Sequence, residues 1–284
     1  MSAARRRSAV GRLATHAGEH AFLLAVAGVS LFPLYVMLVA SFQRATSFGG
    51  SALLPTLSPT FDNYSQVWTE LGFDRMFVNS VVLSLSSAAI ATLLAAGAAY
   101  GFTRFRFAGR WALLVGIVGM MAIPPIVVIV PLFVTMSDLG MINRMSSAIA
   151  VEAGLNLPFA TFLLFTYMRD IPAELFEAAE VDGASRRRQF AEIAWPMSVP
   201  ALTTTMVVCA MYAWNDLLVP LVLWQTEQLT TLMVGLALLG PGRSGAQDVP
   251  LLMAGVTISV APLIVAFLIG RRALARGLVE GGER

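Results

Sequence analysis

The stretch that decides how this chain is organised is AELFEAAEVDGASRRRQFAEIAWP, from Ala173 to Pro196. It holds five acids and three consecutive arginines in a chain that is 57% hydrophobic and only 13% charged. The mean hydropathy of the whole chain is +0.74. So few polar side chains cannot coat a water-soluble globule of 284 residues. The composition therefore predicts an all-α protein that crosses a membrane several times and keeps this charged stretch outside the lipid.

Six apolar stretches are long enough to cross a bilayer, which takes roughly 20 mainly apolar residues in a helix. These stretches cover about residues 21–42, 77–101, 111–136, 146–168, 197–223 and 249–270. Residues 21–270 are then one transmembrane domain, which includes the charged loop (residues 170–196) between the fourth and fifth spans. Residues 1–20 and 271–284 are expected to be terminal tails.

All 19 cations are arginines, and they are distributed unevenly among the loops. Most lie in the two tails, in the charged loop and between the second and third spans, and four lie in the other loops. Because arginine in short loops is retained on the cytoplasmic side, both termini and the charged loop are expected in the cytoplasm. Three arginines before an apolar run are also typical of a signal peptide, but the length of the first apolar run favours a retained span. The pI near 9.0 then reflects cytoplasmic loops, and no nucleic-acid partner is expected.

Few charged or amide side chains lie inside the spans, where they are costly and usually face protein or a cavity. They are Asn79, Glu152, Asn156, Asn215 and Asp216. Two interpretations stay open: hydrogen bonds between helices, or a polar path for a hydrophilic solute. On the second interpretation, Asn156, Asn215 and Asp216 are the candidate solute contacts.

The third span holds Pro124, Pro125 and Pro131. Each proline removes a backbone donor, so this span is expected to be kinked or broken and to rest against other helices.

The single Cys209 excludes an intrachain disulfide, and both histidines lie in the N-terminal tail. We therefore expect no metal site and no catalytic residues in this chain.

The charged loop itself predicts two short helices. Pro172 is placed to open the first, with Glu174 and Glu177 near the positive end of its dipole. Gly183 can take the left-handed conformation that ends it, and a second helix is expected over 185–193. The apolar stripe of such a pair could lie on lipid headgroups, which the arginines would favour and the acids would oppose. A protein partner could accommodate both the arginines and the acids, so this interpretation is favoured over a lipid surface.

These residues carry a family resemblance. EAAEVDGASRRRQFAEIAWP resembles the EAA loop of ABC-importer permeases, whose pattern is EAA, three residues, Gly, nine residues, Ile, any residue, Leu and Pro. The matching positions are Glu177, Ala178, Ala179, Gly183, Ile193 and Pro196. Trp195 stands where the family usually has Leu.

Other segments resemble the maltose-type carbohydrate permeases, and among them the smaller of the two permease subunits. These segments are NYSQVW (63–68), NSVVLS (79–84), AAYGFTRFRFAGR (98–110), LPFATFLL (157–164), AWNDLLVPLV (213–222) and TTLMVGLALL (230–239). The C-terminal ARGLVEGGER (275–284) is similar to that subunit's tail but is altered at its end, which leaves the tail's contact with an ATPase in doubt.

The resemblance implies a type I ABC-importer permease with six spans in the bacterial cytoplasmic membrane, importing a sugar or sugar derivative with the aid of a solute-binding protein. The implied partners are a second homologous permease subunit, two ATP-hydrolysing subunits, an extracytoplasmic solute-binding protein and membrane lipid. The chain has no lysine and therefore no phosphate-binding P-loop, so it is expected to be no enzyme and to bind no cofactor. ATP and Mg²⁺ would bind the separate ATPase.

The resemblance also implies roles for the loop residues. Phe176, Ala178 and Ala179 would form the seat for the ATPase, Glu177 would pair with a partner cation, and Gly183 would fix the angle of the turn. The residues expected to couple to the ATPase are Phe176, Glu177, Ala178, Ala179, Asp182, Gly183, Ile193 and Pro196. Residues 224–250, between the last two spans, resemble the loop that reaches into the solute-binding protein, although a plain exposed loop is an alternative.

Two other classes of function are weighed against this one. A proton-coupled secondary transporter would use Glu152 and Asp216 as relay groups and would need no EAA loop. A membrane-embedded enzyme is disfavoured because no nucleophile and base lie together in a span.

Overall fold

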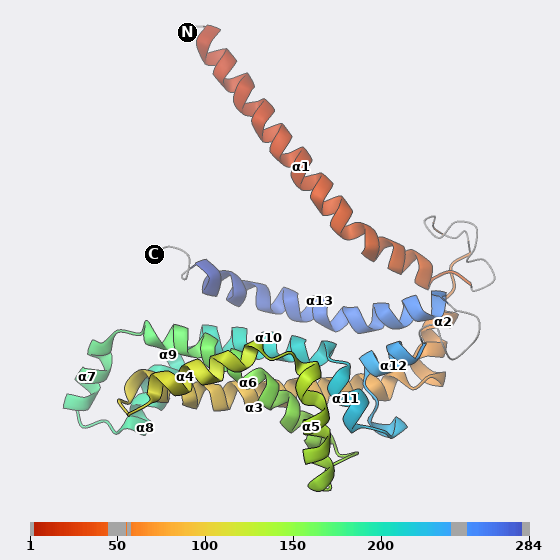
Figure 1. Ribbon diagram of the computed structural model, residues 1–284. Helices are drawn as coiled ribbons and strands as arrows, with labels where there is room; N and C mark the ends of the chain where they lie inside the picture. Colours follow the sequence, from red (N-terminus) through yellow and green to blue (C-terminus); the bar gives the residue numbers. More distant parts are fainter. Residues whose placement is uncertain (1–2, 45–54, 56–57, 240–248, 280–284) are drawn as a thin grey trace. The chain divides into compact units, whose positions relative to one another are not determined.

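The computed structural model describes residues 3–44, 55, 58–239 and 249–279 (Figure 1). Every regular element among these residues is helical, which confirms the all-α class. The chain divides into two compact units, one of residues 1–71 with 240–258 and one of residues 72–239 with 259–284. The helix α13 (Val249–Val279) belongs partly to each unit.

The first unit contains the long helix α1 (Ala3–Ser41), the single turn α2 (Asp62–Ser65) and the π-helical turn η2 (Gln66–Glu70). The Asn63 side-chain amide donates to the carbonyls of Ser41 and Gln43, each at 2.8 Å. The hydroxyls of Ser41 and Tyr64 lie 2.7 Å apart. These bonds satisfy backbone groups at the end of α1 and hold α2 against it. Large apolar side chains in the described part of α1, such as Val29, are exposed, as on a helix that faces lipid.

The second unit holds the other helices and the charged loop. Its elements are α3 (Phe73–Arg104), α4 (Arg110–Gly119), η3 (Met120–Ala122), α5 (Pro125–Asp138), α6 (Met145–Arg169), α7 (Ala173–Val181), α8 (Arg186–Gln189), η4 (Phe190–Ala194), α9 (Trp195–Met197), α10 (Val199–Asn215), α11 (Leu218–Leu223), η5 (Glu227–Leu229) and α12 (Leu232–Leu239). In Figure 1, α7 and α8 lie together at one end of this unit.

The core of the second unit lies where α3 packs against α6 and α10. The buried face of α3 is a row of small residues at helical spacing, among them Ala88, Ala95 and Ala99, none of which has any exposed surface. Small side chains let helix backbones approach closely, which is the usual way that membrane helices pack. Leu164 of α6 and Cys209 of α10 fill the space opposite this row.

Three single helices are long and apolar enough to span a membrane: 18–41, 73–104 and 145–169. Two pairs of helices, each bent at a break, raise the number of candidate spans in the described residues to at most five. The helix α13 contributes only the shorter apolar stretch Val249–Val265 and is not counted among them. The third expected span is the pair α4–η3 and α5, bent by 103° at the break before Pro125. The predicted proline break is confirmed.

The fifth expected span, over 197–223, contains two helices separated by a break. Helix α10 ends at Asn215, the backbone of Asp216 is extended, and α11 begins at Leu218. The Asp216 carboxylate accepts a 2.7 Å hydrogen bond from the Val219 amide. An aspartate in this position satisfies an amide that has no partner within its own helix, so it starts a new helix instead of continuing the old one.

Candidate functional site

The first helix of the charged loop, α7, forms and ends as its residues predict. It follows Pro172 and stops at Val181, and Gly183 has a φ of +79°. The Gly183 amide donates to the Glu180 carbonyl at 3.0 Å and the Ala184 amide to the Ala179 carbonyl at 2.8 Å. This pair of bonds, with a left-handed glycine between them, satisfies two carbonyls at the helix end and fixes the direction in which the chain leaves it.

The inner face of α7 is anchored to the end of α3. The Phe176 ring is 4% exposed, and the Arg104 guanidinium lies 3.4 Å from its centroid. Arg104 also donates to the Ile171 carbonyl at 3.1 Å. An arginine stacked on an aromatic ring is attracted by the electron-rich face of that ring. The resemblance predicts that Phe176 faces a partner, but its side chain packs into the core of its own chain and anchors α7 there.

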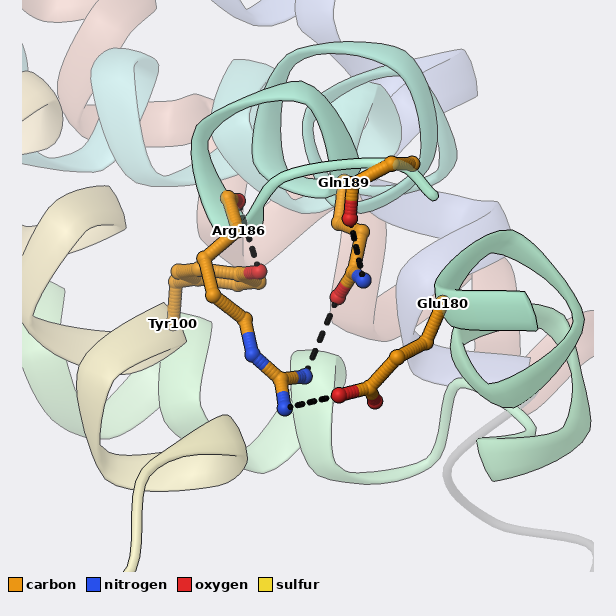
Figure 2. Close-up of polar contacts among 5 residues, drawn as sticks. Tyr100, Glu180, Arg186 and Gln189 are labelled. Carbon is orange, nitrogen blue, oxygen red and sulfur yellow. Dashed lines mark hydrogen bonds and ion pairs between the residues drawn. The ribbon is translucent and has the colours of Figure 1, made fainter. Parts of the chain in front are cut away.

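The turn into α8 is held by a polar network around Arg186, which Figure 2 shows. The Tyr100 hydroxyl donates to the Arg186 carbonyl at 2.9 Å. The Arg186 guanidinium pairs with Glu180 at 2.9 Å and donates to the Gln189 side-chain oxygen at 3.2 Å. Gln189, 1% exposed, donates in turn to the Ala184 carbonyl at 3.1 Å. These contacts tie both helices of the loop to one another and to α3.

The arginine run therefore has partners inside the loop. Besides the pair between Arg186 and Glu180, Arg188 pairs with Glu192 at 2.9 Å, one turn along the helix. Both pairs are largely exposed, and such pairs contribute about 0.2–1 kcal/mol each. The hydrogen bonds of Tyr100 and Gln189, whose side chains are buried, are expected to contribute more to the geometry of the loop.

The outer face of α7 is left uncovered by the described residues. Val181 is 88% exposed, Leu175 is 43% exposed, and Ala178 is exposed beside them. Exposed acids border these apolar side chains: Glu174, Glu177 and Asp182. We call this set the outer face of α7. A small apolar ridge with an acidic border suits a partner groove that has a basic rim.

The remaining loop candidates lie in the second helical stretch. Ile193 is half-buried and packs against the core of the second unit, in the π-helical segment η4. Pro196 is exposed within α9, next to a 73° bend between Met197 and Val199. Ile193 thus connects the loop to the core, and Pro196 lies at the bend into α10.

Sequence reasoning missed Tyr100, Arg104 and Gln189 as functional residues. Tyr100 and Arg104 lie 86 and 67 residues from their loop partners, so no local pattern connects them. The segment that contains Tyr100 and Arg104 resembles the carbohydrate permeases, but that resemblance assigns these two residues no role. Gln189 stands in a charged run where an exposed amide is the ordinary expectation, and only its burial shows its role.

The solute-path candidates separate into two groups. Asn156 and Asp216 line one cavity of about 600 Å³, together with Glu152. Asn215 is exposed and donates to the Met211 carbonyl of its own helix at 2.7 Å. Asn79, for which both interpretations were open, donates to the carbonyls of Gln228 and Thr230 at 2.8 and 3.0 Å, and so ties α3 to η5.

Comparison with known proteins identifies the family. The model of the family described as "Binding-protein-dependent transport system inner membrane component" matches residues 88–280. The chain belongs to this family. The match includes the whole charged loop, the cavity and all the helices from the second half of α3 onward.

One relative is the alpha-glucoside transport system permease protein AglG of Rhizobium meliloti, to which this permease is 36% identical over 257 residues. The alignment covers 87% of this permease and 67% of that relative. The permease is therefore a membrane component of an ABC importer and not an enzyme, and ATP hydrolysis resides in a separate subunit. The secondary-transporter alternative has no support from these relatives.

Two solved structures show the same fold. A bacterial ABC transporter involved in the import of the acidic polysaccharide alginate matches with a TM-score of 0.77 and 22% identity, over 96% of this permease and 98% of that chain. A bacterial alginate ABC transporter in complex with an alginate pentasaccharide-bound periplasmic protein matches with a TM-score of 0.63 and 20% identity, over 93% and 94%. The fold is that of type I ABC permeases.

Proposed function

We propose that this permease is the smaller membrane subunit of an ATP-driven sugar importer and that the outer face of α7 receives the ATPase. The observation that carries the proposal is an apolar ridge, with Val181 88% exposed, on a helix whose other face is fixed to the core through Phe176. A surface that is both exposed and rigidly held can transmit a movement of its partner to the helices behind it.

The charge of the outer face indicates the chemistry of the partner. Exposed Glu177 and Asp182 lie beside the ridge, so a groove with basic residues at its rim is complementary to it. A charged hydrogen bond from such a rim to Glu177 is worth about 1.5–3 kcal/mol. Burying Val181 adds about 1.5–3 kcal/mol, so the seat combines apolar burial with a charged contact.

The proposed topology has six spans, with both termini and the charged loop in the cytoplasm of a bacterial inner membrane. A second, homologous permease completes the pathway, two ATPase subunits dock below, and a solute-binding protein delivers the sugar from outside. The family description, which names binding-protein-dependent transport, supports the binding protein as a partner. The alpha-glucoside relative supports a sugar as the solute.

The docking proposal is tested by Val181→Glu in the importer reconstituted in proteoliposomes with its companion permease, ATPase and binding protein. Because Val181 is 88% exposed, the variant permease is expected to insert normally. Co-purification of the ATPase and ATP-driven uptake are both expected to fall at least tenfold. Glu177→Lys and Gly183→Asp are expected to act in the same direction.

Asp170→Asn is the matched control, because this exposed acid precedes α7 and lies outside its outer face. It is expected to keep normal uptake and normal ATPase content. Normal uptake and co-purification in both Val181→Glu and Glu177→Lys would refute the docking assignment.

The topology is tested by accessibility of single cysteines in a Cys209→Ser background. Arg187→Cys in the charged loop is expected to react with a membrane-impermeant maleimide only from the cytoplasmic side. Gln225→Cys, exposed after α11, is expected to react only from the outer side. Labelling of both positions from one side would overturn the proposed orientation.

A further inference from the structure

A cavity of about 600 Å³ lies beside α6, at a place where two transmembrane segments are broken. On one side it is lined by Met120, Met121 and Ile123, where the backbone between α4 and α5 bends by 103°. On another side it is lined by Asp216, in the extended residue between α10 and α11. Interrupted helices at membrane depth are tolerated where they line a cavity, and in transporters such breaks mark binding sites.

A buried carboxyl group on the cavity wall has one oxygen without a partner among the described residues. Glu152 is 3% exposed, and its Oε1 atom makes no hydrogen bond among the described residues. Its Oε2 atom lies 3.5 Å from the Asn156 side-chain amide, which donates its shorter bond, 2.9 Å, to the Glu152 backbone carbonyl. A buried polar atom left without a hydrogen-bond partner is unfavourable, so a ligand that supplies one is favoured here.

A second acid lies beside Glu152 on the cavity wall. Asp216 and Glu152 line the same cavity and are close enough to interact. The Oδ2 atom of Asp216 is engaged by the Val219 amide at 2.7 Å. Two carboxyl groups this close disfavour a second negative charge, so a proton held between them leaves the pair with one negative charge. None of the described residues that line the cavity is basic.

The rest of the wall is apolar and aromatic. Phe159 of α6 and Tyr212 of α10 both line the cavity, with ring centroids 6.0 Å apart and planes at 77°. Binding sites for small molecules typically combine such apolar surface with a few placed polar groups, in volumes of about 300–1,000 Å³. A sugar ring matches this combination, because its hydroxyls donate while its C–H faces rest against aromatic rings.

We propose that the cavity of Glu152, Asn156 and Asp216 is a binding site for an uncharged sugar and that its two acids exclude anionic sugars. The sugar's hydroxyls donate to the two carboxyl groups. A uronate would add a further negative charge beside this acid pair, and none of the described lining residues is a cation that compensates it, which is strongly unfavourable in a low-dielectric site. The inference rests on the proposed importer function and extends it to the class of solute that this subunit selects.

The test measures solute contact by saturation-transfer NMR on the assembled importer in lipid nanodiscs without its binding protein, so that the signal comes from the membrane subunits. The probes are trehalose and maltose as uncharged sugars, digalacturonate as an anionic sugar and chitobiose as an amino sugar. The wild type is expected to give signal with trehalose or maltose and at least tenfold less with digalacturonate. Glu152→Leu is expected to reduce the uncharged-sugar signal at least fivefold.

Isosteric variants keep the test independent of folding. Glu152→Gln with Asp216→Asn removes both acidic groups while preserving shape, and it is expected to bring the digalacturonate signal within threefold of the uncharged-sugar signal. Asp138→Asn is the matched control, because this exposed acid at the end of α5 does not line the cavity. It is expected to leave both signals unchanged.

Three outcomes would overturn the site. They are equal wild-type signals for digalacturonate and the uncharged sugars, an unchanged signal in Glu152→Leu within an intact complex, or a tenfold preference for chitobiose, which would indicate a cationic ligand. A second measurement, ATP-driven uptake by the same complex with its binding protein, tells a failure of the cavity proposal from a failure of the importer proposal. If the wild type takes up no sugar, the importer proposal is refuted. If the wild type takes up sugar but Glu152→Leu leaves the NMR signal unaltered, only the cavity proposal is refuted.

Discussion

The Arg104 guanidinium lies 3.4 Å from the centroid of the Phe176 ring, so the last residue of α3 covers the buried side chain of α7. Arg104 also donates to the Ile171 carbonyl, just before α7 begins. The two contacts hold α7 at both its entry and its inner face. A partner that moves α7 therefore moves the end of α3 with it, and α3 is the helix on which α6 and α10 pack.

Arg104→Gln tests whether this connection carries the coupling. The substitution removes a cation–π contact worth about 0.5–2 kcal/mol, which corresponds to roughly 2- to 30-fold in the population of the anchored loop. ATP hydrolysis by the reconstituted importer is expected to persist while the sugar imported per ATP hydrolysed falls. Arg106→Gln is the matched control, since it makes the same charge change at an exposed position two residues on. A normal import ratio in Arg104→Gln would contradict the coupling role.

Tyr100→Phe isolates one hydrogen bond of the network in Figure 2. It removes the bond to the Arg186 carbonyl but keeps the ring contacts with Phe105 and Phe190. The loss is expected to be about 0.5–1.5 kcal/mol, measured as faster amide hydrogen exchange over residues 186–189. Tyr100→Ala, which also removes the ring, is expected to have a larger effect. Equal exchange in the wild type and Tyr100→Phe would show that the hydroxyl does not hold the turn.

Gln189→Ala and Glu180→Gln are expected to differ although both touch Arg186. Gln189 is 1% exposed, so its removal leaves the buried end of the network unsatisfied and is expected to cost about 1–3 kcal/mol. The exposed pair of Glu180 with Arg186 is expected to contribute less than about 1 kcal/mol and to weaken further at high salt. Thermal unfolding of the purified permease at low and high salt measures both. A larger loss in Glu180→Gln would reverse this ranking.

Substitutions at Gly183 are expected to act through backbone strain alone. Its φ is +79°, and a side chain added there would meet no atom within 4 Å. Left-handed backbone costs a residue with a Cβ roughly 1–2 kcal/mol, and asparagine tolerates it best. ATPase co-purification is expected to be highest with the native Gly183 and to fall in the order Gly183→Asn, Gly183→Ala and Gly183→Val. Equal co-purification across the series would show that the turn angle is unimportant.

Asn79→Leu tests a structural role at membrane depth. The Asn79 amide donates to the carbonyls of Gln228 and Thr230, and the substitution leaves both without this donor. The permease is expected to lose about 1–3 kcal/mol of stability, seen as a lower Tm in detergent. Asn215→Leu is the control, because the Asn215 side chain is exposed and bonds only within its own helix among the contacts described. A similar drop in both variants would argue against a specific tie between α3 and η5.

Features encoded in neighbouring residues could be predicted from the sequence. The helix α7, its start after Pro172 and its end at Gly183 follow from dihedral preferences that act within a few residues. The break in the third span follows from a proline that lacks a backbone donor. The break at Asp216 could not be predicted in the same way, because an aspartate in an apolar run can either face a polar path or cap a new helix. In the structure Asp216 does both, because its carboxylate accepts from the Val219 amide and also lines the cavity of Glu152.

By itself the sequence determined that this is an all-helical membrane protein with a charged two-helix loop, because hydropathy and local backbone preferences act over short segments. Which face of the loop is buried and which is exposed follows only from the tertiary structure. Phe176 lies inside and Val181 outside because Arg104 and Tyr100, more than 60 residues away in the chain, are packed against the loop. Tertiary packing also places Glu152 and Asp216 in the wall of one cavity. No local sequence pattern specifies the packing of α6 against the break after α10.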